Sequence, residues 1–182
     1  MKKNQLTKLL LWAGAVLMLA FSCKKIILLL ATISTASVTN VTSSGATGGG
    51  NVTSDGGAAV TGRGVCWSTD QNPTVNNSKT SDGSGVGTFT SSISGLSPGT
   101  TYYVKAYAIN SVGTSYGTQV SFSTPAILST LTTAAATAIT STSATTGGTI
   151  TNDGGAAITA RGVVWSRNPA PTMSDSKTTD GT

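Results

Sequence analysis

The sequence contains no histidine and no glutamate, and charged residues make up 9% of its 182 positions. Without histidine, Ser-His-Asp and Cys-His catalytic arrangements are excluded, and the commonest metal ligand is missing. A calcium loop that closes on glutamate is excluded as well. We therefore expect no catalytic site, no metal site and no cofactor.

Small and β-branched residues dominate instead. Threonine, serine, glycine and alanine are abundant, whereas the residues that favour helices are scarce. This bias favours short strands joined by glycine-rich turns. The hydrophobic fraction of 38% and the three tryptophans favour packed domains over disorder. A flexible Ser/Thr/Gly linker is the alternative interpretation of the composition.

The net charge of +5 belongs to the beginning of the chain. Residues 1–25 hold five lysines, whereas residues 26–182 hold six basic residues and six aspartates. A nucleic-acid-binding domain concentrates basic charge on its folded part, because neutralising phosphates drives its affinity. The neutral body of this protein therefore argues against nucleic acid as a partner.

The first residues predict export. A basic start and the apolar residues 9–20 are typical of a signal peptide, here assigned to residues 1–22, and the run is short for a membrane span. Ala-Phe-Ser-Cys at residues 20–23 resembles the lipobox of bacterial lipoproteins. The resemblance implies that Cys23 is lipidated and anchors an exported protein, which we expect at the outer membrane or cell surface. Phe21 and the placement of Leu19 depart from the common pattern, so ordinary signal-peptide cleavage stays the alternative.

Residues 23–34 form a predicted anchor or tether with an unusual composition. Two lysines are followed by an apolar stretch at residues 26–31. An interfacial segment or an extra edge strand would explain this stretch. An uncleaved helix over residues 9–31 is a further alternative, which two charges in mid-span disfavour.

A repeat organises the rest of the chain. Shifting the sequence by 98 positions places residues 41–84 on residues 139–182 without a gap, with about 25 identical pairs. The spacing predicts two copies of one module. The first copy spans residues 35–124, a linker spans 125–132, and a truncated second copy spans 133–182.

Strands and turns can be assigned within the first copy. Asp-Gly pairs supply the positive φ angles of tight turns, and the runs between them carry valine, threonine and aromatic residues. The pattern predicts an all-β protein of tandem β-sandwich modules. The predicted strands are residues 37–42, 46–53, 60–68, 88–93, 102–109 and 119–124.

Residues 96–104, Leu-Ser-Pro-Gly-Thr-Thr-Tyr-Tyr-Val, followed by Ala108, Asn110 and Gly113, resemble the second half of a fibronectin type III domain. The resemblance implies that Tyr102 is a tyrosine-corner residue whose hydroxyl bonds to nearby backbone. A weaker resemblance to the fibronectin type III domain extends over residues 35–124.

Three aromatic residues are predicted to be structural core: Trp67, Tyr102 and Trp165. Fibronectin type III modules carry their core tryptophan on the second strand, whereas Trp67 is assigned to the third. An immunoglobulin-like relative therefore stays open.

The second copy ends at the position that matches Ser84 and lacks counterparts of the later strands. An incomplete β-sandwich would leave its inner face exposed to solvent and its strand edges unpaired. We expect the sequence to be a fragment of a longer reading frame.

The remaining reactive residues have structural explanations. Asp55, Asp82 and their repeats directly precede glycine, as turn residues do. Cys66 is matched by Val164 in the second copy, which indicates a small apolar position. Since Cys23 is assigned to lipid, no disulfide is expected.

Tyr103, Tyr107 and Arg63 form the candidate binding patch. Outward tyrosines stack on sugars or proteins, but cross-strand packing explains the two tyrosines equally well. Arginine stacks on aromatic rings or contacts ligands, but a solvated strand face is the favoured interpretation of Arg63. No site residue therefore decides the function.

The leading hypothesis is a non-catalytic surface lipoprotein whose modules act as spacer, adhesion or scaffold units. Its expected partners are the membrane, through the lipid, and surface polysaccharide or other surface proteins. The alternatives are an accessory region of a larger secreted hydrolase and a carbohydrate-binding module.

Overall fold

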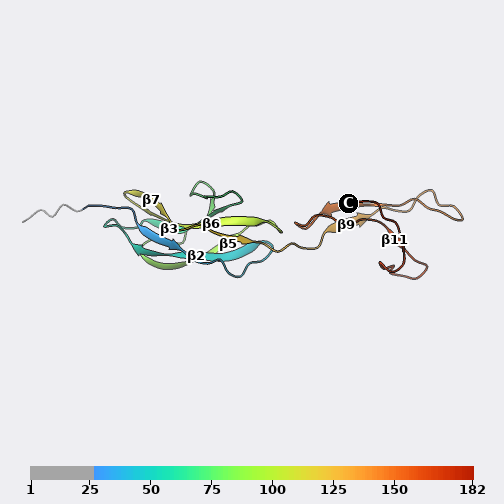
Figure 1. The fold of residues 1–182 in the computed structure, drawn as a ribbon, viewed down its shortest axis with the longest axis horizontal. Helices are drawn as coiled ribbons and strands as arrows, with labels where there is room; N and C mark the ends of the chain where they lie inside the picture. The colour runs from blue at the N-terminus through green and yellow to red at the C-terminus, as the bar shows by residue number, and fades with distance from the viewer. Residues whose placement is uncertain (1–26) are drawn as a thin grey trace, which may run out of the picture.

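The structure is a computed structural model that describes residues 27–182. The predicted signal peptide at residues 1–22 and the predicted lipidation site Cys23 lie outside the described residues. The described part is all-β, as predicted, and its strands form two bodies that follow one another along the long axis (Figure 1). We call residues 27–124 the first region and residues 125–182 the second region.

The first region is a sandwich of two antiparallel sheets. One sheet has the order β1-β2-β5, and the other has the order β4-β3-β6-β7, with β8 pairing β6 beside β7. The strands are β1 (Thr32–Thr35), β2 (Gly45–Ser54), β3 (Gly62–Ser68), β4 (Ser78–Lys79), β5 (Gly87–Ser94), β6 (Thr101–Asn110), β7 (Gly113–Tyr116) and β8 (Val120–Ser123).

The core of the first region lies between these sheets. On β6, alternate residues point inward, and Tyr102, Val104 and Ala106 are all buried. Val65 of β3 and Ile93 of β5 complete the same cluster. Because both sheets contribute to one cluster, neither sheet can be removed without exposing the core of the other.

Tyr102 is held at the edge of this core. Its ring stacks on Phe122 with centroids 5.8 Å apart. Its hydroxyl accepts a hydrogen bond of 3.0 Å from the backbone amide of Ser97. Trp67 packs against the cluster from β3 and stays partly exposed.

The beginning of the first region differs from the prediction. Residues 37–42 form no strand and make only an isolated bridge between Thr39 and Thr47. Asn40 has a φ of 50°, which interrupts an extended chain. The first strand is instead β1, which begins inside the predicted tether, and its Thr35 hydroxyl accepts the amide of Ala106 at 3.0 Å.

The second region repeats the local structure of the first but has fewer strands. β9 (Thr130–Thr133) pairs β10 (Gly148–Asn152), and β11 (Val164–Trp165) pairs β12 (Ser176–Lys177). β9 lies 98 residues after β1, and β12 lies 98 residues after β4. β11 lies 98 residues after residues 66–67 of β3. β9 also begins inside the predicted linker at residues 125–132.

The prediction that Trp165 lies in a core is wrong for this structure. Trp165 is 52% exposed, whereas Trp67 at the matching position packs on the first core. Within the described residues, β11 pairs only with β12. In the first region β6 pairs β3 alongside Trp67, and no strand among residues 27–182 does the same beside Trp165.

Candidate functional site

The two regions meet at a contact between two glycine turns. Pro98 and Gly99 form the turn before β6, and Gly154 and Gly155 form the turn after β10. Gly99 has a φ of 60° and Gly155 a φ of 81°, which favour glycine. A Cβ atom placed on Gly99 would collide with the carbonyl of Gly155, and one placed on Gly155 would collide with the carbonyl of Pro98. Only turns without side chains approach this closely.

The connecting residues are bonded to both regions. The amide of Gly99 donates to the carbonyl of Pro125 at 3.2 Å, and the amide of Ile127 donates to the carbonyl of Gly154 at 2.8 Å. The chain therefore leaves the first region along one turn and enters the second along the other. We call this arrangement of residues 98–99, 125–127 and 154–155 the junction.

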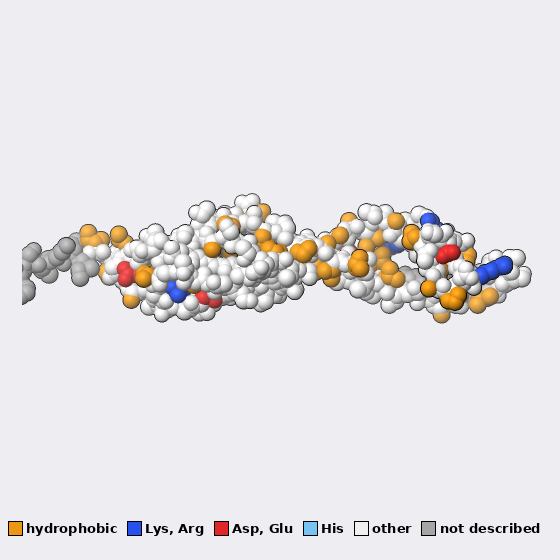
Figure 2. Space-filling model, turned by 90° about the horizontal axis from the view of Figure 1, so that it is seen from below, with side chains coloured by type: hydrophobic (Ala, Val, Ile, Leu, Met, Phe, Trp, Pro, Cys, Tyr) orange, Lys and Arg blue, Asp and Glu red, His pale blue; other side chains and the backbone are white. Residues whose placement is uncertain are grey.

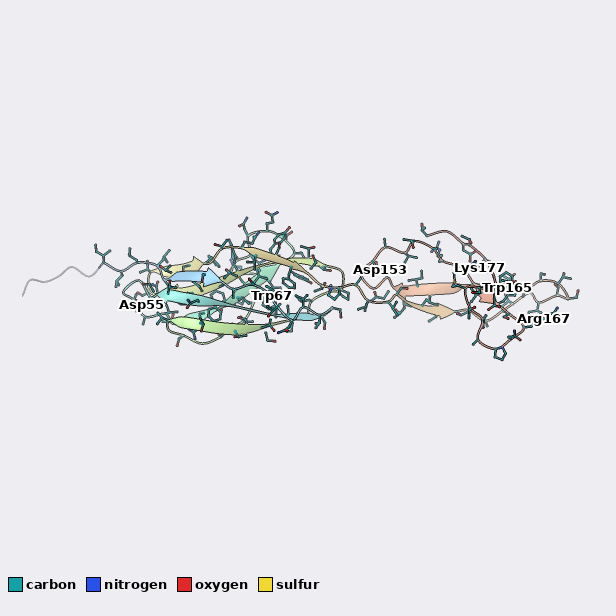
Figure 3. The ribbon with its side chains drawn as sticks, turned by 60° about the horizontal axis from the view of Figure 1, so that its bottom comes forward. Asp55, Trp67, Asp153, Trp165, Arg167 and Lys177 are labelled. Atoms are coloured by element: carbon teal, nitrogen blue, oxygen red, sulfur yellow. The ribbon has the colours of Figure 1, made fainter. Side chains whose placement is uncertain are left out.

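The hydrogen bond between the entering chain and the Asp-Gly-Gly turn also occurs at the other end of the first region. There the amide of Leu29 donates to the carbonyl of Gly56 at 2.8 Å, which matches the bond from Ile127 to Gly154. The aspartates shape both turns, since Asp55 and Asp153 each accept the amide two residues later at 2.9 Å. Figure 3 shows Asp55 and Asp153 at the ends where the chain enters the two regions. The Asp-Gly-Gly turn thus receives the entering chain in each region.

Arg63 belongs to the packing of the first region and not to an open binding patch. One terminal nitrogen of its guanidinium donates to the carbonyls of residues 85–87 at 3.0–3.3 Å. The guanidinium also lies 5.3 Å from the centre of the Phe89 ring. These bonds tie β3 to the segment that leads into β5, which corrects the predicted role.

Tyr107 is also unavailable to a ligand. Its side chain is 4% exposed, and its hydroxyl donates to the carbonyl of Thr80. Burial raises the pKa of the Tyr107 hydroxyl, and the Asp82 carboxylate acts in the same direction. Tyr103 is half-buried on β6. Tyr107 and Arg63 therefore do not form an open patch with Tyr103, because the Tyr107 side chain is buried and Arg63 is bonded within the first region.

Cys66 has the environment of a structural cysteine. Its thiol is fully buried and donates a weak bond to the carbonyl of Lys105 at 3.5 Å. Burial raises the pKa of the Cys66 thiol to about 11, although Lys105 and Lys79 oppose the shift. The thiol is thus protonated near neutral pH and is not activated as a nucleophile.

Residues 27–182 hold neither a cluster of metal ligands nor a candidate membrane-spanning helix. No group of three or more histidine, cysteine, aspartate or glutamate side chains in this part is placed to hold a metal ion. No helix in the same part has the length and apolar character needed to cross a membrane.

The junction was not foreseen from the sequence. The Asp-Gly-Gly and Pro-Gly sequences predict turns, but nothing in them indicates that one turn rests on the other. The sequence feature that could have indicated the contact is a pair of glycines after the aspartate in both copies, at residues 56–57 and 154–155. A hairpin turn alone requires fewer glycines than this.

Comparison with known proteins gives distant likenesses of fold. No protein-family model matches the chain. No curated protein sequence matches it either.

Among solved structures, the chain is similar to the sensor domain of the anti-sigma factor RsgI4 of Pseudobacteroides cellulosolvens. The identity is 20%, the TM-score is 0.39, and the match covers 53% of this chain and 76% of that one. A shorter version of the same domain is 19% identical with a TM-score of 0.42, and the match covers 56% of this chain and 100% of that one. A structure described as a myokine is 19% identical with a TM-score of 0.41, and the match covers 53% of this chain and 99% of that one. At these values the likenesses carry no argument about function.

Proposed function

We propose that this protein is a non-catalytic, exported surface lipoprotein whose β-modules act as spacer or scaffold units. The observation that carries the proposal is the junction. A spacer must keep a fixed length, and a glycine-on-glycine contact with flanking backbone hydrogen bonds restricts bending between two modules.

The direction of the chain supports a spacer. The chain enters the first region at one end and leaves it at the other, so that each region adds its length along the same axis (Figure 1). With the predicted lipid at Cys23, successive modules would extend away from the membrane surface. The same geometry suits the presentation of a surface for protein or polysaccharide partners.

We further propose that the modules are tandem fibronectin type III-like repeats. In constant-type immunoglobulin domains, the fourth strand joins the sheet of the first and second strands. Here β4 pairs β3 in the opposite sheet. The hydroxyl of Tyr102, which accepts the amide five residues earlier, is consistent with the tyrosine corner of such domains.

A matched pair of glycine substitutions tests the spacer. Gly155→Ala and Gly57→Ala place a methyl group at equivalent turn positions with φ near 80°, and each costs about 1 kcal/mol of local strain. Only the first methyl meets the neighbouring region, because the nearest atoms to a Cβ on Gly57 are 3.6 Å away.

The distance between spin labels at Ser92 and Thr151 measures the junction. We expect a single narrow distance distribution for the wild type and for Gly57→Ala, and a broadened, shifted distribution for Gly155→Ala. A broad distribution in the wild type would contradict a rigid spacer.

The anchor is tested separately. Metabolic labelling with a fatty-acid probe should mark the wild type and leave Cys23→Ala unlabelled, with loss of the variant from the membrane fraction. Equal labelling of both proteins would exclude Cys23 as the lipidation site.

A further inference from the structure

Exposed apolar side chains gather at the end of the first region where the chain enters it (Figure 2). Residues 27–30 are an isoleucine followed by three leucines, and their side chains are 45–68% exposed. Val112, in the turn between β6 and β7, is 47% exposed. We call residues 27–30 and Val112 the entry patch.

The backbone of the entry patch is fixed to the first region. The amide of Leu29 donates to the carbonyl of Gly56 at 2.8 Å, and the carbonyl of Leu29 accepts Nδ2 of Asn110 at 2.7 Å. Asn110 is buried, and its Nδ2 also donates to the carbonyl of Asp55 at 2.8 Å. Its Oδ1 accepts the amide of Val112 at 3.0 Å. One buried asparagine therefore holds both parts of the entry patch in place.

The side chains of the entry patch divide into a packed pair and an outward pair. A Cβ atom on Gly57 would lie 3.6 Å from Cδ2 of Leu28, and one on Gly113 would lie 3.2 Å from Cδ2 of Leu30. These two leucines therefore lie against the neighbouring turns. The two more exposed side chains, at 68% and 60%, are those of Ile27 and Leu29.

The β-module itself does not require all of these apolar residues. Shifted by 98 positions, residues 27–30 match Pro-Ala-Ile-Leu at residues 125–128. The last two positions are apolar in both segments, and the amides of Leu29 and Ile127 make the same bond to a glycine carbonyl. The first two positions differ, because large apolar residues replace proline and alanine. Entry into a module therefore explains the shared pair and leaves Ile27 and Leu28 unexplained.

The proposed lipid brings the entry patch close to a membrane. Ile27 follows Cys23 by four residues, and four fully extended residues span at most about 14 Å. If Cys23 carries lipid, the entry patch lies within about this distance of the headgroups. Residues 24–25 are lysines, and basic side chains favour anionic headgroups. A bilayer is therefore the occupant that the chain itself brings to this surface.

The charge at this end of the first region limits the depth of contact. The carboxylate of Asp55 accepts the amide of Gly57 at 2.9 Å, beside the turn on which Leu28 packs. A carboxylate is costly in the hydrocarbon core of a bilayer. The arrangement therefore fits a shallow contact at the boundary between headgroups and acyl chains.

We propose that the entry patch inserts into the surface of a lipid bilayer and holds the first region against it. The apolar side chains reach about 5–10 Å into the boundary between headgroups and acyl chains, as interfacial segments do. Because the backbone of the patch is bonded to the first region, insertion fixes the orientation of that region and not only its distance from the membrane. The proposal rests on the proposed lipidation of Cys23, and it adds a second contact to that single anchor.

The collision accessibility of a spin label at residue 112 measures the insertion. The full chain with Val112→Cys and Cys66→Val is recovered from membranes and placed in vesicles of phosphatidylethanolamine and phosphatidylglycerol. We expect the label to be accessible to oxygen and shielded from a water-soluble nickel chelate. A label at Leu128→Cys, a position that is 91% exposed in the second region, is the matched control and should show the reverse.

A pair of double substitutions tests which side chains cause the insertion. Ile27→Ser/Leu29→Ser removes the two outward side chains and leaves the backbone bonds, so the label at residue 112 should shift toward water. Leu128→Ser/Ile139→Ser removes two side chains that are at least as exposed, in the second region, and should leave the label in place. Because all four side chains are exposed, both variants should fold as the wild type does.

A label at residue 112 that stays accessible to the chelate on vesicles would overturn the proposal, whether or not the chain carries lipid. An equal shift in both double variants would overturn it as well. Spin–spin broadening that rises with protein concentration in vesicle-free detergent would assign the entry patch to a second copy instead. Fatty-acid labelling of Cys23 is measured separately, so a lipidated chain with residue 112 in water keeps the proposed anchor and loses only the inserted patch.

Discussion

The two regions carry the same local structure but differ in burial. The amide of Val65 donates to the hydroxyl of Thr80 at 2.9 Å, and the amide of Val163 donates to that of Thr178 at the same distance. Val65 is nevertheless 0% exposed, whereas Val163 is partly exposed. Short-range sequence therefore sets the turns and side-chain bonds, while strands from far along the chain make the core.

The largest expected difference concerns buried charge. Val65→Asp places a carboxylate in a core that has no partner for it, and we expect a loss of more than about 4 kcal/mol and no cooperative unfolding of the first region. Val163→Asp should leave the unfolding transition of the first region within about 0.5 kcal/mol of the wild type. Chemical denaturation followed by circular dichroism measures both. Equal effects of the two variants would remove the contrast between the regions.

A smaller difference concerns the two arginines. Arg63→Ala removes the charged hydrogen bonds to residues 85–87 and the contact with Phe89, so we expect a loss of about 2 kcal/mol. Arg161→Ala removes only a bond to an exposed carbonyl, and the loss should be below about 0.5 kcal/mol. Thermal unfolding of the two variants compares them. A larger effect at Arg161 would contradict the assigned contacts.

The smallest expected difference is a pH dependence at Cys66. The pKa of this thiol is about 11 in the folded chain and ordinary in the unfolded chain. Between about pH 9 and pH 11 the unfolded state therefore loses the proton first, and the stability of the first region falls as the pH rises.

Cys66→Val introduces the residue found at Val164 and should reduce this slope. Denaturation midpoints at pH 8 and pH 10.5 measure it. Tyr107, whose pKa is also raised, acts in the same direction and remains in both proteins. An unchanged slope in Cys66→Val would show that the thiol is not its source.

The contrast also explains which features the sequence predicts. The Asp-Gly turns depend on neighbouring residues, and they occur at residues 55–57 and 153–155 as expected. The alternation on β6 places Tyr102 in the core for the same reason. These features require no knowledge of distant strands.

Features that depend on distant partners were predicted less well. Tyr107 points away from the core, but the chain near Thr80 covers it. Trp165 repeats Trp67 in sequence, yet the described chain places no strand over it. The junction depends on two turns that are 56 residues apart in the chain (Gly99 and Gly155), and local patterns carry no information about such contacts.

Hydrogen exchange of two matched amides tests the central contrast most directly. The amides of Val65 and Val163 make the same bond to a threonine hydroxyl, so a difference in their protection reports the surrounding core and not the bond itself. We predict that the Val65 amide exchanges on the order of a thousandfold more slowly than the Val163 amide. Equal protection of the two amides would contradict the account.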